Sequence, residues 1–450
     1  MGVLFGTDGI RGQANSYPIT AELALNLGKA IAHVFEAEGH GTRRALIGKD
    51  TRLSGYMLET ALTSGLVSMG MDVFLVGPVP TPAVAHLTKT MNADAGVMLT
   101  ASHNPFDDNG IKIFSRDGFK LSDEMEDLLE KHLLSGELVS DHIRSENLGK
   151  SYRIEDARGR YIEFAKSTAR NLELNGLKLV LDCANGAAYQ IAPWIFKELG
   201  AEVVKIFAEP DGFNINNDCG ALHSATVGRA VLEHKADLGI AFDGDADRVV
   251  FCDAAGKEVD GDRVLAMCAL DLKKRKMLRK NTLVVTTMSN LGLVKRMSEA
   301  GITTETTDVG DRYVIECMRK GGFNLGGEKS GHLIYTDFAT TGDGIVSALQ
   351  VLSLMVRTGQ PLAELADCME EYPQQLRSLP VAAKKPLAEQ PTLVSELAAC
   401  RQALGDEGRV LVRYSGTEKK IRLLVEAKQQ ELVDQWMETL SRAVEKDLNQ

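Results

Sequence analysis

Apolar positions in the first part of the chain switch between helical spacing and short continuous runs. Residues 21–35 carry apolar side chains at intervals of three or four behind Thr20, which predicts a capped amphipathic helix. The apolar run at 45–47 predicts a buried strand, and the same pair recurs as a helix over 54–69 and a strand over 73–76. Helices that alternate with strands in this way indicate an α/β architecture.

A second pattern, in which an apolar strand, a short polar loop and another apolar strand follow one another, occurs in four places. The paired strands are expected at 96–99 and 111–114, at 238–242 and 249–252, at 323–325 and 333–335, and at 410–413 and 421–425. If the first three units are alike, their loops would meet at one cleft, because ligands in α/β folds bind at strand ends. The alternative is that this arrangement is simply common in α/β proteins. The fourth unit ends in an expected helix over 430–447 and reads as a small α+β domain.

Length and charge restrict the class of protein. A chain of 450 residues is too long for one hydrophobic core and suggests three or four domains. Its 62 acidic and 51 basic residues give a net charge of -11, which argues against a nucleic-acid or acidic-membrane partner. The basic run 273–276 predicts the solvated end of a helix. Seven scattered cysteines without a Cys-x-x-Cys pair, and no apolar run long enough for a membrane span, suit a cytoplasmic protein.

Three aspartates, Asp243, Asp245 and Asp247, alternate along what should be an extended segment, so their side chains are expected on one side. Clustered carboxylates repel one another unless a cation lies between them, and oxygen ligands favour Mg²⁺. An EF-hand is excluded because its loop needs Gly and Glu where Arg248 and Ala254 stand. An acidic surface turn is the alternative, although apolar residues flank the cluster on both sides.

Ser102, within the segment Thr100 to Pro105, is a candidate phosphorylation site that such a cation would assist. A serine hydroxyl is a poor nucleophile at neutral pH, but a phosphoserine beside a divalent cation is a phosphoryl donor. A phosphate on Ser102 would complete the coordination of Mg²⁺, and Arg248 could reach the same phosphate or pair with a neighbouring aspartate. A capped turn set by Asn104 is the alternative for the serine segment.

Two nearby residues are candidates for proton transfer. His103 is either a base or a side chain that satisfies a local hydrogen bond. Lys112 could transfer a proton if nearby cations lower its pKa, and is otherwise a solvated lysine.

The loop at 413–418 has the composition of a phosphate cradle. A phosphate dianion is bound by a guanidinium, by hydroxyls and by a glycine that lets backbone N–H groups approach, and these are supplied by Arg413, Ser415, Gly416 and Thr417. Arg422 adds a further positive charge nearby. A plain β-turn is the alternative.

Taken together in their order along the chain, these segments resemble the α-D-phosphohexomutase superfamily, and most closely its bacterial members that act on glucosamine phosphates. The segments that carry the resemblance are Phe5 to Gly12, Thr100 to Pro105, Asp243 to Arg248, Val259 to Asp262, Val309 to Val314, Gly327 to His332, Thr340 to Gly344 and Arg413 to Glu418. Such ordered agreement over nearly the whole chain is more specific than any single motif.

The resemblance implies three related α/β domains with mixed sheets and a smaller C-terminal α+β domain around a central cleft. The expected domains are 1–150 with the phosphoserine loop, 151–256 with the magnesium loop, 257–370 with the sugar-recognition loop and 371–450 with the phosphate-binding loop.

It also implies roles for single residues. Ser102 would be the phosphoserine and a metal ligand beside Asp243, Asp245 and Asp247. Sugar hydroxyls would be held by Glu328 and Ser330, and the unreactive phosphate by Arg413, Ser415, Gly416 and Thr417, with Arg422 nearby. Protons would be transferred, or charge stabilised, by Arg11, His103, Lys112 and His332, with Arg248 beside the carboxylates. Two departures from the family pattern are Lys419, where Pro is common, and Lys329 in the sugar loop, which bears on the fine substrate preference.

The implied reaction is transfer of the Ser102 phosphoryl group to a hexosamine 6-phosphate, which gives a 1,6-bisphosphate that turns end for end and returns its other phosphate. The leading expectation is interconversion of glucosamine 6-phosphate and glucosamine 1-phosphate for UDP-N-acetylglucosamine and cell-wall synthesis, with Mg²⁺ as cofactor and glucosamine 1,6-bisphosphate as primer. A phosphomannomutase or phosphoglucomutase of the same superfamily, a Mg²⁺-dependent sugar phosphatase and an inactive sugar-phosphate binder are the alternatives. The oligomeric state is left open, a homodimer included.

Overall fold

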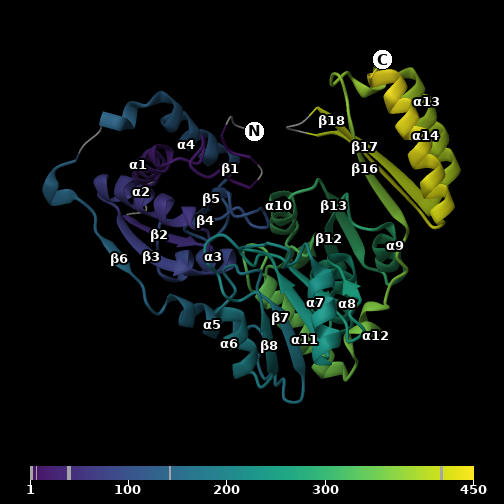
Figure 1. The fold of residues 1–450 in the computed structure, drawn as a ribbon, viewed down its shortest axis with the longest axis horizontal. Coiled ribbons are helices and arrows are strands. Elements are labelled where there is room, and N and C mark those ends of the chain that lie inside the picture. Colours follow the sequence, from purple (N-terminus) through teal and green to yellow (C-terminus); the bar gives the residue numbers. More distant parts are fainter. Residues whose placement is uncertain (1–3, 7, 38–41, 141–142, 416–418, 450) are drawn as a thin grey trace. The chain divides into compact units, whose positions relative to one another are not determined.

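The structure, a computed structural model, describes residues 4–6, 8–37, 42–140, 143–415 and 419–449. The chain divides into two compact units. Residues 1–288 and 301–368 form the first, and residues 289–300 and 369–450 form the second. Within the described ranges the strands form four sheets, of which three belong to the first unit (Figure 1).

The first sheet has the strand order β1-β5-β4-β2-β3-β6. Its strands are β1 (Ile10–Gln13), β2 (Arg44–Lys49), β3 (Asp72–Pro78), β4 (Ala95–Leu99), β5 (Asp108–Ser115) and β6 (Ser151–Arg153), and its helices are α1 (Ala21–Ala37), α2 (Ser54–Ser68), α3 (Thr81–Thr90) and α4 (Asp123–Ser135). The central strands β2 and β4 run parallel and are almost entirely buried. Their continuous apolar runs are what a parallel strand covered on both faces requires.

The second and third sheets have the orders β11-β10-β9-β7-β8 and β13-β12-β14-β15. The second contains β7 (Lys178–Asp182), β8 (Glu202–Ile206), β9 (Leu238–Phe242), β10 (Val249–Cys252) and β11 (Glu258–Val259), with α5 (Ala157–Ser167), α6 (Ile191–Glu198) and α7 (Ser224–His234). The third contains β12 (Thr282–Thr286), β13 (Thr303–Thr307), β14 (Leu325–Gly327) and β15 (Leu333–Tyr335), with α8 (Gly261–Lys274), α10 (Asp311–Gly321), α11 (Gly344–Thr358) and α12 (Leu362–Ala366). As expected, the basic run at 273–276 lies at the end of α8.

The three sheets repeat one arrangement. In each, three parallel strands are followed by an antiparallel fourth, in the orders β3-β2-β4-β5, β8-β7-β9-β10 and β13-β12-β14-β15. The prediction of related α/β units, each with a strand–loop–strand segment, is therefore confirmed. The strand expected at 323–325 was placed too early: β14 spans Leu325–Gly327, so Gly326 and Gly327 lie in the strand and not in the loop.

The second unit is smaller. Its antiparallel sheet has the order β16-β18-β17, formed by β16 (Gln374–Pro380), β17 (Gly408–Tyr414) and β18 (Lys420–Ala427). The helices α13 (Pro391–Leu404) and α14 (Gln430–Leu448) lie side by side and pack on this sheet (Figure 1). The helix α9 (Leu291–Glu299) also belongs to this unit. The expected α+β character and the C-terminal helix are both confirmed.

Short 3₁₀ helices complete the described elements, at Glu137–Ser140, Ser145–Asn147, Arg279–Asn281, Leu387–Glu389 and Gly405–Glu407. Among the helices of the described residues, none is both long enough and apolar enough to cross a lipid bilayer. All seven cysteines are free thiols.

Candidate active site

Ser102 lies in the loop between β4 and β5, and its side chain is directed at the aspartate loop of the second sheet. The residue is 1% exposed, and its Oγ donates a hydrogen bond of 2.6 Å to Oδ2 of Asp243. The same Oγ lies 3.3 Å from Nδ1 of His103. The loops of two different sheets therefore meet at the serine, as the repeated strand–loop–strand pattern predicted.

The three aspartates converge, although not on an extended segment. Residues 243–248 form a turn between β9 and β10, in which the N–H of Ala246 donates to the carbonyl of Asp243 and Ala246 has a φ of 57°. The prediction of an extended segment was therefore wrong. The turn nevertheless brings one oxygen each from Asp243, Asp245 and Asp247 within 4.8 Å of one another, and all three residues are buried.

Two oxygens of this cluster have no hydrogen-bond partner among the described residues. They are Oδ1 of Asp245 and Oδ1 of Asp247, both buried. Their companion oxygens are occupied, because Asp245 Oδ2 accepts from Thr81 Oγ1 at 2.6 Å and both Oδ2 atoms accept from Lys112 Nζ. Buried carboxylate oxygens without partners are costly unless a cation binds them, and hard oxygen ligands suit Mg²⁺. The residues present therefore fit the expected metal.

Charge within the cluster is unevenly distributed. Burial, followed by the charges of Asp247 and Asp245, raises the pKa of Asp243 well above its ordinary value. Burial alone would raise the pKa of Asp247 too, but Lys112 and His332 hold it well below the ordinary value. The three carboxylates therefore lie in different electrostatic surroundings, and Asp243 is the one that accepts the serine hydroxyl.

Lys112, on β5, does not meet the condition under which it was expected to transfer protons. Its ammonium lies 2.9 Å from Asp245 and 3.0 Å from Asp247, and the side chain is 1% exposed. Burial would lower its pKa, but these carboxylates and Asp8 raise the pKa well above the ordinary value. Lys112 therefore keeps its positive charge, and its pKa is not lowered as proton transfer would require.

His103 is in the opposite situation. Burial, and then the positive charges of Arg248 and Arg11, lower its pKa to about 4. The imidazole is therefore neutral near pH 7 and has a ring nitrogen able to accept a proton beside Ser102 Oγ.

Further charged side chains surround the cluster. Arg11, on β1, forms an ion pair with Asp8, and Lys120 forms ion pairs with Asp8 and, at 2.5 Å, with Asp311. The backbone N–H of Arg248 donates to Asp243 at 3.1 Å. Burial lowers the pKa of Arg248 but Asp247 and Asp243 raise it, and the net effect is an increase. Its guanidinium therefore stays charged next to the carboxylates.

His332, directly before β15, contacts the segment Thr340 to Gly344. Burial lowers the pKa of His332, Asp247 and Asp311 raise it, and the net effect is an increase. The N–H of Gly342 lies 3.1 Å from its Nε2. Its Nδ1 lies 3.7 Å from Asp247 Oδ1.

The sugar loop, residues 328–332, is stabilised by the segment Val259 to Asp262. The N–H of Gly261 donates to the carbonyl of Lys329 at 3.1 Å, and the ammonium of Lys329 lies 3.4 Å from Asp260. Glu328 accepts the N–H of Gly310 at 3.0 Å and the hydroxyl of Ser330 at 3.3 Å. The unusual Lys329 is thus paired with an acid of its own domain, and the side chain of Ser330 is exposed.

Several residues that bear on the site carried no motif in the sequence. Asp50 and Arg52 are buried and form an ion pair of 2.9 Å, and Arg52 donates to carbonyls of the serine loop. Asn216 donates to the same loop, and Thr81 binds Asp245. Asp50 and Arg52 follow directly after the buried strand β2, a position that could have marked them. Asn216 had no such signal.

The proposed phosphate cradle lies in the second unit. Arg413 and Arg422 are direct partners across β17 and β18, although like charges placed opposite each other are destabilising. Ser415 is 5% exposed, and Lys384 Nζ donates to its carbonyl at 2.6 Å. Gly416 and Thr417 lie outside the described residues. A pair of opposed arginines with a lysine beside them favours an anionic ligand.

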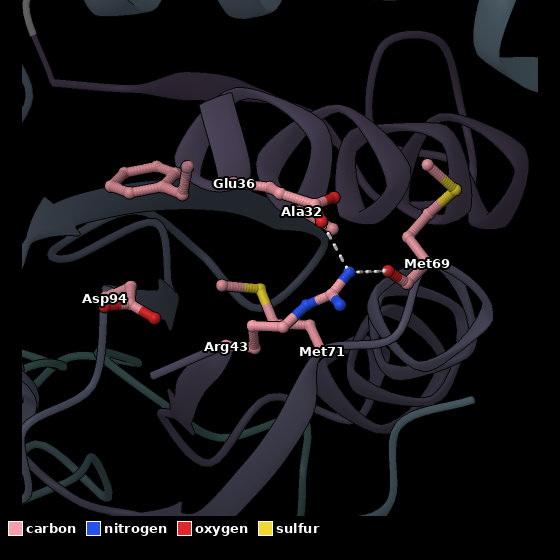
Figure 2. A pocket seen from close by; sticks show the side chains of 7 residues that line it. Ala32, Glu36, Arg43, Met69, Met71 and Asp94 are labelled. Atoms are coloured by element: carbon pink, nitrogen blue, oxygen red, sulfur yellow. Dashed lines mark hydrogen bonds and ion pairs between the residues drawn. The ribbon is translucent and has the colours of Figure 1, made fainter. Parts of the chain in front are cut away.

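A separate pocket of about 170 Å³ lies in the first sheet's domain (Figure 2). There Arg43 forms an ion pair of 2.8 Å with Glu36 and donates to the carbonyl of Met69. None of the candidate active-site residues lines it.

Comparison with protein families finds four matches in order along the chain. They are phosphoglucomutase/phosphomannomutase alpha/beta/alpha domain I at residues 2–139, domain II at 159–256, domain III at 260–372 and the C-terminal domain at 376–443.

Comparison with known proteins finds similarity over the full length. The chain is 53% identical to a phosphoglucosamine mutase of Pelobacter propionicus over 448 residues, 99% of each chain, and 52% identical to one of Myxococcus xanthus, covering 98% and 97%. Its fold is similar to that of a phosphoglucomutase/phosphomannomutase family protein of Burkholderia thailandensis, with a TM-score of 0.81, 24% identity and coverage of 98% and 97%. An Aspergillus fumigatus N-acetylphosphoglucosamine mutase, solved with GlcNAc-6P and magnesium, gives a TM-score of 0.64 at 18% identity over 99% and 96%.

Proposed function

Because the chain belongs to the phosphoglucomutase/phosphomannomutase family, we propose that it interconverts glucosamine 6-phosphate and glucosamine 1-phosphate through a phosphorylated Ser102. The observation that carries the proposal is the 2.6 Å contact between Ser102 Oγ and Asp243 in a buried triad of carboxylates. The choice of glucosamine phosphate is supported by whole-chain relatives named phosphoglucosamine mutase at 52–53% identity.

In this proposal the phosphoryl group of phospho-Ser102 passes to the free sugar oxygen. The bond between phosphorus and Oγ breaks, a bond to the sugar oxygen forms, and the hydroxyl proton of the sugar passes to a base. The bisphosphate then turns end for end and returns its other phosphoryl group to Oγ. Glucosamine 1,6-bisphosphate consequently primes protein that has lost its phosphate.

The metal would be held by Asp243, Asp245 and Asp247 together with the Ser102 group, and when bound it would neutralise charge on the moving phosphoryl group. Lys112 and Arg248 add fixed positive charge at the same place. The observation that an Aspergillus relative was solved with magnesium supports Mg²⁺ as the cofactor.

His103 is our candidate for the base, because Nδ1 of its neutral ring lies 3.3 Å from Ser102 Oγ. Arg11 and His332 are assigned to charge stabilisation. Glu328 and Ser330 are proposed to bind sugar hydroxyls, which is supported by the position of Glu328 on the loop that also carries His332.

We extend the proposal to the second unit and to the domains. Arg413, Ser415, Gly416, Thr417 and Arg422 would hold the phosphate that does not react. The domain boundaries are proposed near residues 150, 256 and 370. A cytoplasmic enzyme that supplies UDP-N-acetylglucosamine synthesis is the setting in which this reaction would be used.

The test is a comparison of kcat/KM on glucosamine 1-phosphate, glucose 1-phosphate and mannose 1-phosphate, with catalytic bisphosphate and MgCl₂. We expect the highest value for glucosamine 1-phosphate, and loss of turnover by about a thousandfold or more in Ser102→Ala. Ser64→Ala on the surface of α2 is the matched control and should keep full activity. A clear preference for mannose or glucose phosphate would show that glucosamine phosphate is not the substrate. Stoichiometric release of inorganic phosphate would show that the protein is a phosphatase and not a mutase.

A further inference from the structure

Two side chains hold the same pair of carbonyl groups in the serine loop. Arg52 Nη2 donates to the carbonyl of Ser102 at 3.0 Å and to that of Asn104 at 2.8 Å. Asn216 Nδ2 donates to the same two carbonyls, at 2.8 Å and 2.9 Å. A carbonyl oxygen has two lone pairs, so each of these oxygens is fully occupied by the two donors.

The two donors come from different domains. Arg52 follows β2 in the domain of the serine itself, and its guanidinium is fixed by Asp50 at 2.9 Å. Asn216 lies between β8 and α7 in the domain of the second sheet. The hydrogen bonds from Arg52 therefore come from the serine's own domain, and those from Asn216 come from a neighbouring domain.

Residues 211–216, which we call the clamp loop, contact the first domain at two further points. The rings of Phe213 and Phe106 meet edge to face with centroids 5.5 Å apart. The N–H of Leu53 donates to the carbonyl of Gly212 at 3.1 Å. These contacts place the amide of Asn216 against the serine loop.

The backbone at both ends of the Asn216 contact is left-handed. Ser102 has a φ of 50°, which costs free energy for a serine, and Asn216 has a φ of 58°, which asparagine adopts more readily than most residues. Gly244 of the aspartate turn lies so close that a Cβ there would be 2.5 Å from the carbonyl oxygen of Ser102. The left-handed backbone of Ser102 persists only if its surroundings fix it, and the hydrogen bonds from Arg52 and Asn216 to its carbonyl do so.

We propose that Asn216 is a positioning residue for phosphoryl transfer, and that the clamp loop makes the alignment of Ser102 Oγ with Asp243 depend on the second domain. This inference rests on the proposed function of Ser102. Without the Asn216 amide, the carbonyls of Ser102 and Asn104 lose one donor each, and the loop relaxes away from its left-handed backbone. Sugar binding uses other residues, so the effect falls on kcat and leaves KM unchanged.

The experiment uses two variants of the full-length protein that remove the amide in different ways. Asn216→Gly tolerates a positive φ, so it deletes the donor without adding backbone strain. Asn216→Asp keeps the size and shape but has no N–H groups to donate. The control is Asn171→Gly, because Asn171 is an exposed residue of the same domain, has a φ of 62° and lies outside the clamp loop.

We expect kcat to fall about tenfold to a hundredfold in both Asn216 variants, since a displacement of about 1 Å at a reacting group has effects of this size. KM should stay within about twofold and Asn171→Gly should match the wild type in kcat. Amide hydrogen exchange over residues 100–106, measured without substrate, should be faster in both Asn216 variants than in the control.

A kcat within about twofold of the wild type in Asn216→Gly and Asn216→Asp would overturn the inference, whether or not the melting temperature falls. Unchanged exchange over residues 100–106 would overturn it as well. Because exchange needs no substrate, it still tests the clamp if the wild type turns over no hexosamine phosphate, an outcome that would refute the proposed function instead.

Discussion

At the scale of single residues, the site is organised by three buried carboxylates that lie close together. Asp243, Asp245 and Asp247 are buried together, and Lys112 is the ammonium that binds two of them. Like charges at this separation are tolerated only when a positive charge offsets them. The two buried oxygens that have no hydrogen-bond partner in the described part of the chain are where further positive charge belongs.

This arrangement predicts weaker metal binding in Asp247→Asn. The variant keeps the size of the side chain but removes one negative ligand, so the affinity for Mg²⁺ in isothermal titration calorimetry should fall at least about tenfold. Asp127→Asn, at an exposed position of α4, is the control and should bind Mg²⁺ as the wild type does. Equal affinities for the wild type and Asp247→Asn would place the metal elsewhere.

Sequence reasoning reached Ser102 and the aspartates that converge in the structure, and it missed residues that contact them, such as Asn216. Ser102 and the three aspartates could be predicted because nucleophile and carboxylates stand out between apolar strands. Asn216 could not, because an asparagine in a polar loop is unremarkable until the fold brings it to the carbonyl of Ser102. The prediction that residues 243–248 are extended was wrong because the sequence pattern does not distinguish a strand from a turn: either can bring alternate carboxylates together.

At the scale of elements, the loop after β15 is built around the ring of His332. The N–H of Gly342 donates to Nε2, and Asp343 begins α11 by accepting the N–H of Val346 at 2.9 Å and the hydroxyl of Tyr161 at 2.8 Å. A Cβ at position 342 would lie 2.3 Å from Nε2 of His332. The glycine is therefore required by the close approach of the imidazole.

Gly342→Ala should consequently displace His332 from Asp247. We expect kcat to fall about tenfold or more, by the reasoning that small displacements at a catalytic centre are costly, together with a lower melting temperature. Gly159→Ala in α5 is the matched substitution, because nothing lies within 4 Å of the added methyl group. It should leave kcat unchanged and stabilise the helix by up to about 1 kcal/mol. Full activity in Gly342→Ala would show that the position of His332 is not critical.

The strands themselves were predictable because their apolar runs are continuous and their loops are polar. The hairpins β4–β5, β9–β10 and β17–β18 lie where those runs indicated. The end of β14 was misplaced because Gly326 and Gly327 have low strand propensity, whereas in the structure they pair with Ile334 and Leu333 on β15.

At the scale of the first unit, ion pairs join the domains of the first and third sheets. Arg312 on α10 is 9% exposed, lies 3.0 Å from Glu126 and 2.5 Å from Asp123 on α4, and donates to the carbonyl of Leu121 at 3.2 Å. Lys120 and Asp311 form a second pair beside it. The segment Val309 to Val314 thus serves to dock one domain on another.

Removing this contact should loosen the unit. Arg312→Ala leaves Glu126 without its partner, so we expect a loss of about 1–3 kcal/mol and a melting temperature lower by several degrees. Lys320→Ala, which removes a positive charge from the same helix where the side chain is 81% exposed, should shift it by far less. Thermal unfolding followed by circular dichroism measures both, and equal melting temperatures would assign no docking role to Arg312.

The repetition of one sheet order in three successive domains has a consequence for how such a molecule could arise. Copies of a single ancestral segment, joined in tandem, would each carry the same hairpin at the same edge, and the hairpin tip is the part that can change without disturbing the strands below it. Under the proposed function, the first copy would carry the nucleophile, the second the cation site, and the third a ring nitrogen and a carboxylate. Each tip could then change separately, while the shared sheet order kept the three tips near one another.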